Sequence, residues 1–214
     1  MHYLTNLWNS LDFGSMKDLL LRLCGVFLCL TVHETCHGLA AWALGDPTAK
    51  RQHRLSLNPL RHIDWFGLAM MVTAGFGWAK PVPVNPNYFK NPKRGMAVTA
   101  LAGPVSNFLL ALVLLLSVRL FWLTSVAGGW LYFLLETAIL SIGLGVFNLI
   151  PIPPLDGSKI LFSLLPDKAY RTMLRYERIG TVVLWVLVLT DVGDRFISEA
   201  IYVIFDLFCR IVGI

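Results

Sequence analysis

Charged residues are scarce in this chain of 214 residues. Only 14% of them are Asp, Glu, Lys or Arg, whereas 56% are hydrophobic. A soluble globular domain carries roughly 25% charged residues, so the composition excludes an ordinary soluble domain and favours a membrane protein. Residues 1–17 also lack the basic n-region and the small-residue cleavage site of a signal peptide, and we therefore expect no cleaved leader.

Cysteine pairs of the Cys-x-x-Cys type are absent as well. Three of the four cysteines fall in or near one apolar stretch. The four are Cys24, Cys29, Cys36 and Cys209. We therefore expect free thiols rather than a disulfide framework.

Long apolar stretches, by contrast, are abundant. Three of them provide the ~20 mostly apolar residues that a membrane-spanning helix needs. They are residues 17–44, 95–123 and 130–150. Two shorter stretches, which the sequence leaves open as spans, follow at residues 179–189 and 196–214. We predict an all-α polytopic membrane protein in the lipid bilayer, a single domain over residues 1–214, with a core at 18–165 and C-terminal helices at 178–214.

Residues 66–86 do not fit this helical pattern. The apolar run at 66–72 is too short to span, and Gly75, Gly77 and three prolines follow it. Because glycine and proline disfavour a helix, we expect a re-entrant extended or β segment near residues 66–86 that dips into the membrane. Its edge would pair with an unwound substrate peptide by β-strand addition. The alternative is a plain cytosolic loop with a hydrophobic foot.

The first apolar stretch contains the pattern His-Glu-x-x-His at residues 33–37. In a helix of 3.6 residues per turn, His33 and His37 project from one face, where two imidazoles can hold a zinc ion. Glu34 beside them would act as a general base toward a water molecule. Two such histidines also occur on ordinary polar helix faces, but here the residues on both sides of the motif are almost wholly apolar.

A carboxylate far downstream has a second unusual setting. The third apolar stretch ends in three prolines within four positions, which cannot continue a regular helix, and Asp156 follows on this broken backbone. A carboxylate beside apolar sequence is costly without a partner, and a metal cation would be that partner. His33, His37 and Asp156 would together supply an N, N, O ligand set and leave a fourth position for water.

The distribution of basic residues brings the two motifs together. Residues 46–94 carry eight Lys or Arg and residues 159–178 carry five, whereas the links at 124–129 and 190–195 carry only Arg195. If the three long stretches all span, both basic loops lie on one side, which the positive-inside rule makes cytoplasmic. Both motifs then lie toward that end of the membrane. The net charge of +5 is explained by these loops, so we expect no nucleic-acid partner.

Other polar residues near the motifs were candidates for the site. His53 and His62 lie in a basic, proline-containing stretch and fit loop residues better than ligands, and Cys36 is expected to face a neighbouring helix. Asn148 or Asn107 could hydrogen-bond the oxyanion or the substrate backbone. An interhelical hydrogen bond explains Asn107 nearly as well.

Two motifs together resemble those of the site-2 protease family of intramembrane zinc metalloproteases, peptidase family M50. They are His-Glu-Thr-Cys-His-Gly at 33–38 and Asn-Leu-Ile-Pro-Ile-Pro-Pro-Leu-Asp-Gly at 148–157. Segments 77–86 and 103–107 are also similar to family segments. The resemblance covers roughly residues 20–165, and the chain looks like a minimal form with room for neither a PDZ nor a CBS domain.

The resemblance implies an intramembrane zinc endopeptidase with one zinc ion per chain. His33, His37 and Asp156 would be the ligands and Glu34 the base. The residues implied to receive the substrate are Asn148, Pro151 and Pro153, with Gly75 and Gly77 in a re-entrant β element. The partners implied are membrane-spanning proteins or remnant signal peptides, and no feature predicts an oligomeric state.

Two other classes of protein share some of these features. A non-catalytic zinc-binding membrane protein or transporter would keep the three ligands but has no need of Glu34. A membrane metalloprotease that acts outside the bilayer needs long soluble loops carrying its third ligand, and no loop here is long. The small size favours a multi-pass protein of a prokaryotic plasma membrane, with its active site toward the cytoplasmic side.

Overall fold

The computed structural model describes residues 16–74, 78–123, 129–175, 177–190 and 193–214. Among these residues three helices are long and apolar enough to cross a membrane. They are α2 (Met16–Ala43), α5 (Pro92–Leu123) and α6 (Gly129–Leu149). They match the three predicted spans to within a few residues, so the prediction of an all-α integral membrane protein is confirmed.

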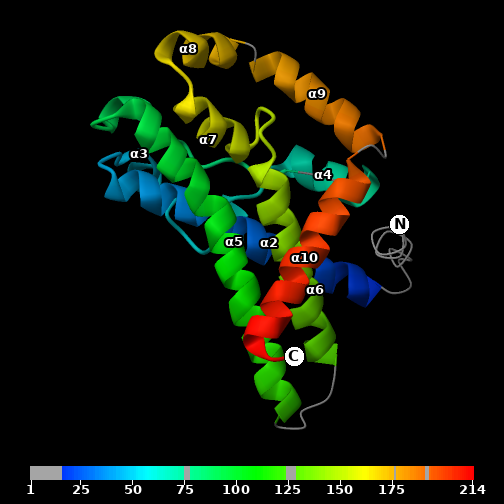
Figure 1. Ribbon diagram of the computed structural model, residues 1–214. Helices are drawn as coiled ribbons and strands as arrows, with labels where there is room; N and C mark the ends of the chain where they lie inside the picture. Colours follow the sequence, from blue (N-terminus) through cyan, green and yellow to red (C-terminus); the bar gives the residue numbers. More distant parts are fainter. Residues whose placement is uncertain (1–15, 75–77, 124–128, 176, 191–192) are drawn as a thin grey trace.

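The three long helices pack against one another, and α10 (Asp194–Val212) lies along α5 and α6 (Figure 1). The contact between α5, α6 and α10 is formed by small and aliphatic side chains. The buried members of this cluster are Ala111, Leu114 and Leu115 of α5, Ala138 and Ile142 of α6, and Val212 of α10. Helix association in lipid depends on close van der Waals packing, and Ala111 and Ala138, both fully buried, let the backbones of α5 and α6 approach.

The shorter elements gather at the end where α2 and α6 stop and α5 begins (Figure 1). They are α3 (Thr48–Arg51), η1 (Pro59–Arg61), α4 (Trp65–Ala74), η2 (Pro86–Tyr88), α7 (Asp156–Leu164), α8 (Asp167–Arg175) and α9 (Glu177–Leu189). Lys93 contacts the Leu165 carbonyl and pairs with Asp167 at 3.3 Å. The two basic loops therefore lie at the same end of the molecule, as their charge predicts.

The two C-terminal helices do not qualify as spans by length and hydropathy among the described residues. Helix α9 has 13 residues, which makes it about 20 Å long, and a hydrocarbon core is about 30 Å thick. Helix α10 has 19 residues but includes charged side chains such as Glu199 and Asp206. Its packing on α5 and α6 makes it part of the core bundle.

The prediction of an extended segment at residues 66–86 is wrong over the first part of that range, because residues 65–74 form helix α4. The Asp64 side chain accepts hydrogen bonds from the N–H groups of Phe66 at 3.0 Å and Gly67 at 2.9 Å, which caps the start of the helix. The glycines and prolines that disfavour a helix come only after it. Residues 75–77 lie outside the described residues, and residues 78–85 are non-helical, with one isolated antiparallel bridge between Ile63 and Ala79.

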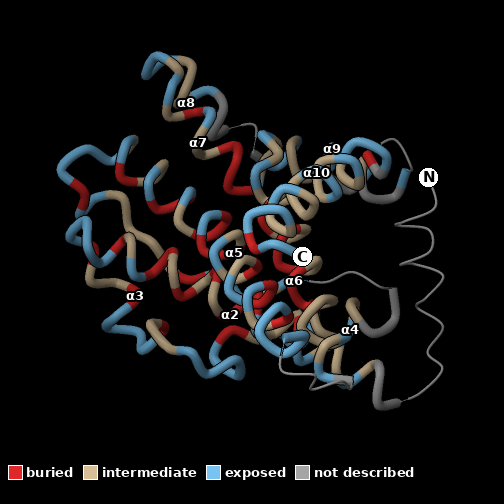
Figure 2. The backbone as a smooth tube through the Cα atoms, turned by 60° about the horizontal axis from the view of Figure 1, so that its bottom comes forward, coloured by how far each residue is buried: buried red, intermediate tan, exposed pale blue. Residues whose placement is uncertain are grey.

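Burial follows this arrangement. Figure 2 shows that buried residues gather where α2, α5 and α6 meet and at the start of α7. The described side chains of α8 and α9 include none that is buried. The largest polar side chain that is fully buried, Asn107, lies in this central region on α5. Polar groups so far from water require partners or a function.

Candidate metal centre

Three buried side chains from distant parts of the chain meet at one point: His33 and His37 of α2 and Asp156 at the start of α7. The Nε2 atoms of the two histidines are 3.0 Å apart. Asp156 Oδ2 lies 3.2 Å from His33 Nε2 and 3.0 Å from His37 Nε2. Among the described residues this is the group of His, Cys, Asp and Glu side chains with metal-ligand spacing.

The chemistry and spacing of this group fit a zinc ion. Ligand atoms of a tetrahedral zinc site, each about 2.0–2.2 Å from the metal, are about 3.3 Å apart. The three ligand atoms here are 3.0–3.2 Å apart, so only a small outward movement is needed. With two imidazole nitrogens and one carboxylate oxygen, the set leaves one position for water, as catalytic zinc sites do.

Close packing of α5 against α2 holds the two imidazole rings. The rings lie edge to face, with centroids 4.5 Å apart. Gly103 of α5 lies directly against them, because a Cβ atom built there would be 2.5 Å from His37 and 2.6 Å from His33. Only a glycine lets the backbone of α5 come this near to both rings.

The other nitrogen of each imidazole has a different environment. His37 Nδ1 lies 2.7 Å from the Thr99 carbonyl oxygen of α5. Because a carbonyl only accepts, Nδ1 carries the proton and Nε2 keeps its lone pair for a metal, an arrangement typical of metal-binding histidines. His33 Nδ1 is buried and has no hydrogen-bond partner among the described residues.

Asp156 is positioned by the tight turn between α6 and α7. Backbone of Leu149 passes so near to Gly157 that a Cβ atom there would be 2.1 Å from the Leu149 carbonyl oxygen. Burial acts to raise the pKa of Asp156, but the adjacent imidazoles of His33 and His37 and the charge of Lys159, 3.3 Å away, hold this pKa well below its usual range. The carboxylate is therefore in its charged form, which is the form that binds a metal.

Glu34 follows His33 on α2 and has a specific backbone partner. Its Oε2 atom accepts a hydrogen bond from the Val82 N–H at 2.8 Å. Val82 is buried and belongs to the non-helical residues 78–85. The carboxylate beside the ligand set is thus fixed by a segment that lies almost fifty residues further along the chain.

The two asparagines proposed to contact the substrate differ in their environments. Asn107 is fully buried one turn beyond Gly103, and neither its side-chain oxygen nor its side-chain nitrogen has a partner among the described residues. The interhelical hydrogen bond at this position uses its main-chain carbonyl, which accepts from Ser141 Oγ at 2.8 Å. Asn148 donates from Nδ2 to the Leu144 carbonyl at 2.9 Å, within the last turns of α6.

The other residues predicted to contact the substrate differ in exposure and surroundings. Pro151 is exposed and Pro153 is partly buried. Pro153 packs near α9, since a Cβ atom at Gly180 would lie 2.8 Å from its ring. The remaining two, Gly75 and Gly77, lie outside the described residues.

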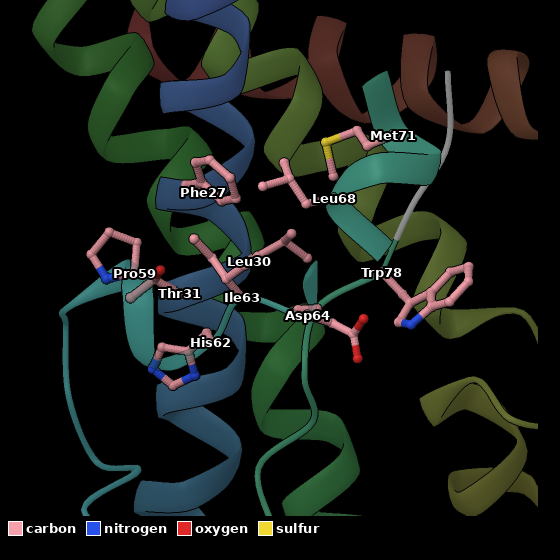
Figure 3. A pocket seen from close by; sticks show the side chains of 11 residues that line it. Phe27, Leu30, Thr31, Pro59, His62, Ile63, Asp64, Leu68, Met71 and Trp78 are labelled. Carbon is pink, nitrogen blue, oxygen red and sulfur yellow. The ribbon is translucent and has the colours of Figure 1, made fainter. Parts of the chain in front are cut away.

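The residues weighed as alternative ligands are not part of the metal group. His53 is exposed. His62 is buried, its Nε2 lies 2.8 Å from the Ser56 carbonyl oxygen, and it lines a small pocket between α2 and α4 (Figure 3). Cys36 is a free thiol of intermediate exposure. As the loop composition predicts, both histidines are loop residues outside the metal group, and only His62 has a packing role.

Several groups at the site could not be named from the sequence. The Thr99 carbonyl and the Val82 N–H are backbone groups. Every residue has a backbone carbonyl and every residue except proline has a backbone N–H, so no residue type marks these two groups in the sequence. Lys159 is three residues after Asp156 on α7, a spacing that brings the two side chains to one helix face. The i, i+3 spacing of Asp156 and Lys159 is the signal in the sequence that predicts this contact.

Three membrane-length helices around a buried His, His, Asp group with an adjacent glutamate define a helical membrane metallohydrolase. The family model described as "Peptidase family M50" matches residues 123–190. Relatives match most of the chain. YwhC of Bacillus subtilis (strain 168), named as a candidate zinc metalloprotease, is 40% identical over 175 residues, which are 79% of this chain and 80% of YwhC.

A second relative extends the match. Rip2 of Mycolicibacterium smegmatis, also named as a candidate zinc metalloprotease, is 30% identical over 197 residues, which are 87% of this chain and 73% of Rip2. No solved structure matches this chain. The chain belongs to peptidase family M50 and is a zinc metalloprotease embedded in a membrane.

Proposed function

We propose that this zinc metalloprotease is an intramembrane endopeptidase that hydrolyses peptide bonds in or near membrane-spanning segments of other proteins. The observation that carries the proposal is the position of the metal group. Two of its members lie on α2, a membrane-length helix, and all three are buried among α2, α5 and α7. A peptide bond must therefore come to the bundle at membrane depth to be cut.

In this proposal His33, His37 and Asp156 hold the zinc ion and Glu34 is the general base. Zinc, when bound, supplies a Lewis acid that lowers the pKa of water and polarises a peptide carbonyl. Glu34 accepts the proton of the attacking water at its carboxylate and then delivers it to the leaving amine. The hydrogen bond from Val82 leaves one carboxylate oxygen of Glu34 for these proton transfers.

Substrate contacts are assigned to groups near the metal group. The unpartnered side-chain amide of Asn107 is available to donate to a developing oxyanion, and removal of such a donor costs about 10²–10³-fold in kcat in other hydrolases. Asn148 at the end of α6 and the two prolines on the turn that leads to Asp156, Pro151 and Pro153, would receive the substrate there. The non-helical residues 78–85, with Gly75 and Gly77 before them, would bind an unwound substrate strand.

The whole chain would act as one unit in the cell membrane. We assign residues 1–214 to a single domain, supported by the packing of α10 on α5 and α6. The basic loops at one end support a cytoplasmic position of that end, and with it of the metal centre, by the positive-inside rule. A prokaryotic plasma membrane and substrates such as single-span proteins or remnant signal peptides complete the proposal.

A zinc-binding membrane protein without catalysis is less well supported. It would need the three ligands but neither Glu34 nor the backbone contact that holds its carboxylate. A protease that works outside the bilayer on soluble peptides would need its metal group outside the spanning helices.

The position of the cut tests the proposal. Purified protein in detergent is incubated with a single-span model substrate, and the products are identified by mass spectrometry. We expect one or a few cuts within the span or within a few residues of it. Cuts confined to the soluble flanks of the substrate, far from the span, would contradict intramembrane cleavage while leaving the protease activity intact.

A further inference from the structure

The non-helical segment Lys80–Asn85, here called the strap, is tied down along its whole length. The Lys80 N–H donates to the His62 carbonyl at 2.8 Å, and the Asn85 N–H donates to Asp46 Oδ2 at 2.6 Å. Between these ends, the Val82 N–H donates to Glu34. The Val82 side chain packs against Gly38 of α2, where an added Cβ would lie 3.2 Å from Val82 Cγ1.

A buried arginine holds the middle of the strap. Arg54 Nη2 donates to the Lys80 carbonyl at 2.6 Å and to the Pro81 carbonyl at 3.3 Å. Arg54 is 8% exposed, and none of the ion pairs among the described residues includes it. A buried guanidinium without a carboxylate is costly, so its hydrogen bonds to these two carbonyls account for its position.

The contact from Arg54 and the contact to Glu34 belong to the same peptide unit. The Pro81 carbonyl and the Val82 N–H are the two polar groups of the peptide bond between these residues. This unit is planar, so a donor that fixes the carbonyl oxygen also fixes the direction of the N–H on the other side. The charged donor also polarises the unit and strengthens the hydrogen bond that the N–H makes.

The sequence of the strap isolates this one N–H. Residues 81 and 83 are prolines, which have no N–H, so Val82 is the single backbone donor between Lys80 and Val84. The prolines also restrict the backbone on both sides of Val82. The Lys80–Val84 stretch is thus built to present one donor at a fixed place.

We propose that Arg54 is a positioning residue of the proteolytic site: it fixes the Pro81–Val82 peptide unit, and this unit holds the Glu34 carboxylate in place beside the metal ligands. The assignment rests on the proposed role of Glu34 as general base. Arg54 itself contacts none of the metal group and takes no part in the proton transfers. It acts on the reaction only through Val82 and Glu34.

Hydrogen exchange tests the link between Arg54 and Val82 without any cleavage. A proteolytic fragment over residues 80–84 carries backbone amide hydrogens only at Val82 and Val84, because Lys80 becomes its free amino terminus and residues 81 and 83 are prolines. In Arg54→Met we expect one amide of this fragment to exchange at least about tenfold faster, with or without zinc, because its bond to Glu34 is weakened. Arg61→Met is the matched control, since Arg61 is in the same loop and donates to the His53 carbonyl instead.

Steady-state cleavage of a single-span model substrate tests the link to catalysis. We expect Arg54→Met to lower kcat about 10- to 100-fold, since small misplacement of a catalytic group has effects of this size, while KM stays within about twofold. Val82→Pro, which deletes the N–H, should lower kcat similarly. The double variant should fall no further, because both changes remove one contact. Arg54→Lys should recover part of the loss, and zinc content should stay at one per chain.

The outcomes separate this proposal from the proposed function. Unchanged exchange of the 80–84 fragment in Arg54→Met would overturn the role of Arg54, whatever the cleavage result. Additive losses in the double variant, or a raised KM with unchanged kcat, would do the same. A wild-type chain that cuts no single-span substrate, with exchange at Val82 still dependent on Arg54, would contradict the proposed function and leave the structural link standing. If Arg54→Met fails to fold, Val82→Pro and Arg54→Lys carry the test.

Discussion

At the scale of single residues, the proposed mechanism assigns metal binding and proton transfer to different side chains. His33, His37 and Asp156 direct their ligand atoms at one another, whereas Glu34 directs its carboxylate to the Val82 N–H. Replacing a ligand and replacing the base should therefore have different consequences for zinc.

Glu34→Gln tests the role of the base. The amide is nearly the same size as the carboxylate but cannot accept a proton, so we expect cleavage to fall by about 10²–10⁴-fold or more. Zinc should remain at one per chain, because Glu34 is not in the metal group. Metal analysis by mass spectrometry reports the zinc. Loss of zinc in this variant would undo the assigned role.

Asp156→Ala tests the third ligand. The change removes the oxygen that lies 3.2 Å from His33 and 3.0 Å from His37, so we expect loss of both zinc and cleavage. Asp167→Ala is the control. Asp167 is an exposed carboxylate at the start of α8, and its pair with Lys93 is worth about 1 kcal/mol or less. Full zinc content in Asp156→Ala would remove Asp156 from the ligand set.

The candidate site shows which residues a sequence can reveal. Helix periodicity places His33, Glu34 and His37 together. The position of Asp156, a carboxylate just after three prolines and beside apolar sequence, indicates a partner such as a metal ion. The contributions of Thr99 and Val82 come from backbone groups, whose position depends on packing between distant segments. Periodicity carries no information about such contacts.

At the scale of elements, the site depends on how closely α5 approaches α2. Gly103 lies against both imidazoles, and Thr99, one turn before it, accepts from His37. A single turn of α5 thus sets both the ring positions and the protonated nitrogen of His37. The α2–α5 contact is therefore part of the metal centre as well as of the bundle.

Gly103→Ala should weaken zinc binding. Its methyl group would lie 2.5–2.6 Å from the two histidine rings, so either the rings or α5 must move. We expect zinc affinity to fall about tenfold or more, as for other changes in groups that orient ligands. Gly143→Ala of α6 is the matched control, because its methyl group would make an ordinary contact of 3.4 Å with Ile201. Competition with a metal-sensitive dye measures both, and equal affinities in the two variants would contradict the prediction.

The sequence predicts the long helices correctly but not the short helix α4. The three long helices were predictable because each comes from a stretch of at least ~20 mostly apolar residues, the length that crosses a bilayer. Helix α4 was not predictable from its ten mostly apolar residues, because the glycines and prolines directly after it disfavour a helix. Asp64, whose side chain caps two N–H groups, was the local signal for a helix start.

At the scale of the whole molecule, the two basic loops lie together at one end of the bundle (Figure 1). The metal group lies toward the basic end, where Lys93 of one loop meets Asp167 of the other. If this end is cytoplasmic, substrates reach the metal centre from the cytoplasmic half of the bilayer.

Cysteine labelling tests this orientation. In a variant without the four native cysteines, Lys90→Cys marks the basic end and Trp130→Cys, at an exposed position near the start of α6, marks the other. We expect a membrane-impermeant maleimide to label position 130 in intact cells and position 90 only after permeabilisation. The reverse pattern would place the metal centre toward the outside.

Zinc-dependent cleavage is the measurement that tests the central claim most directly. Purified wild-type protein and Glu34→Gln, each with one zinc per chain, are incubated with a single-span substrate in detergent, with and without a chelator. The account predicts products from the wild type alone, lost with the chelator and restored by added zinc. Equal cleavage by wild type and Glu34→Gln, or cleavage that survives removal of zinc, would contradict it.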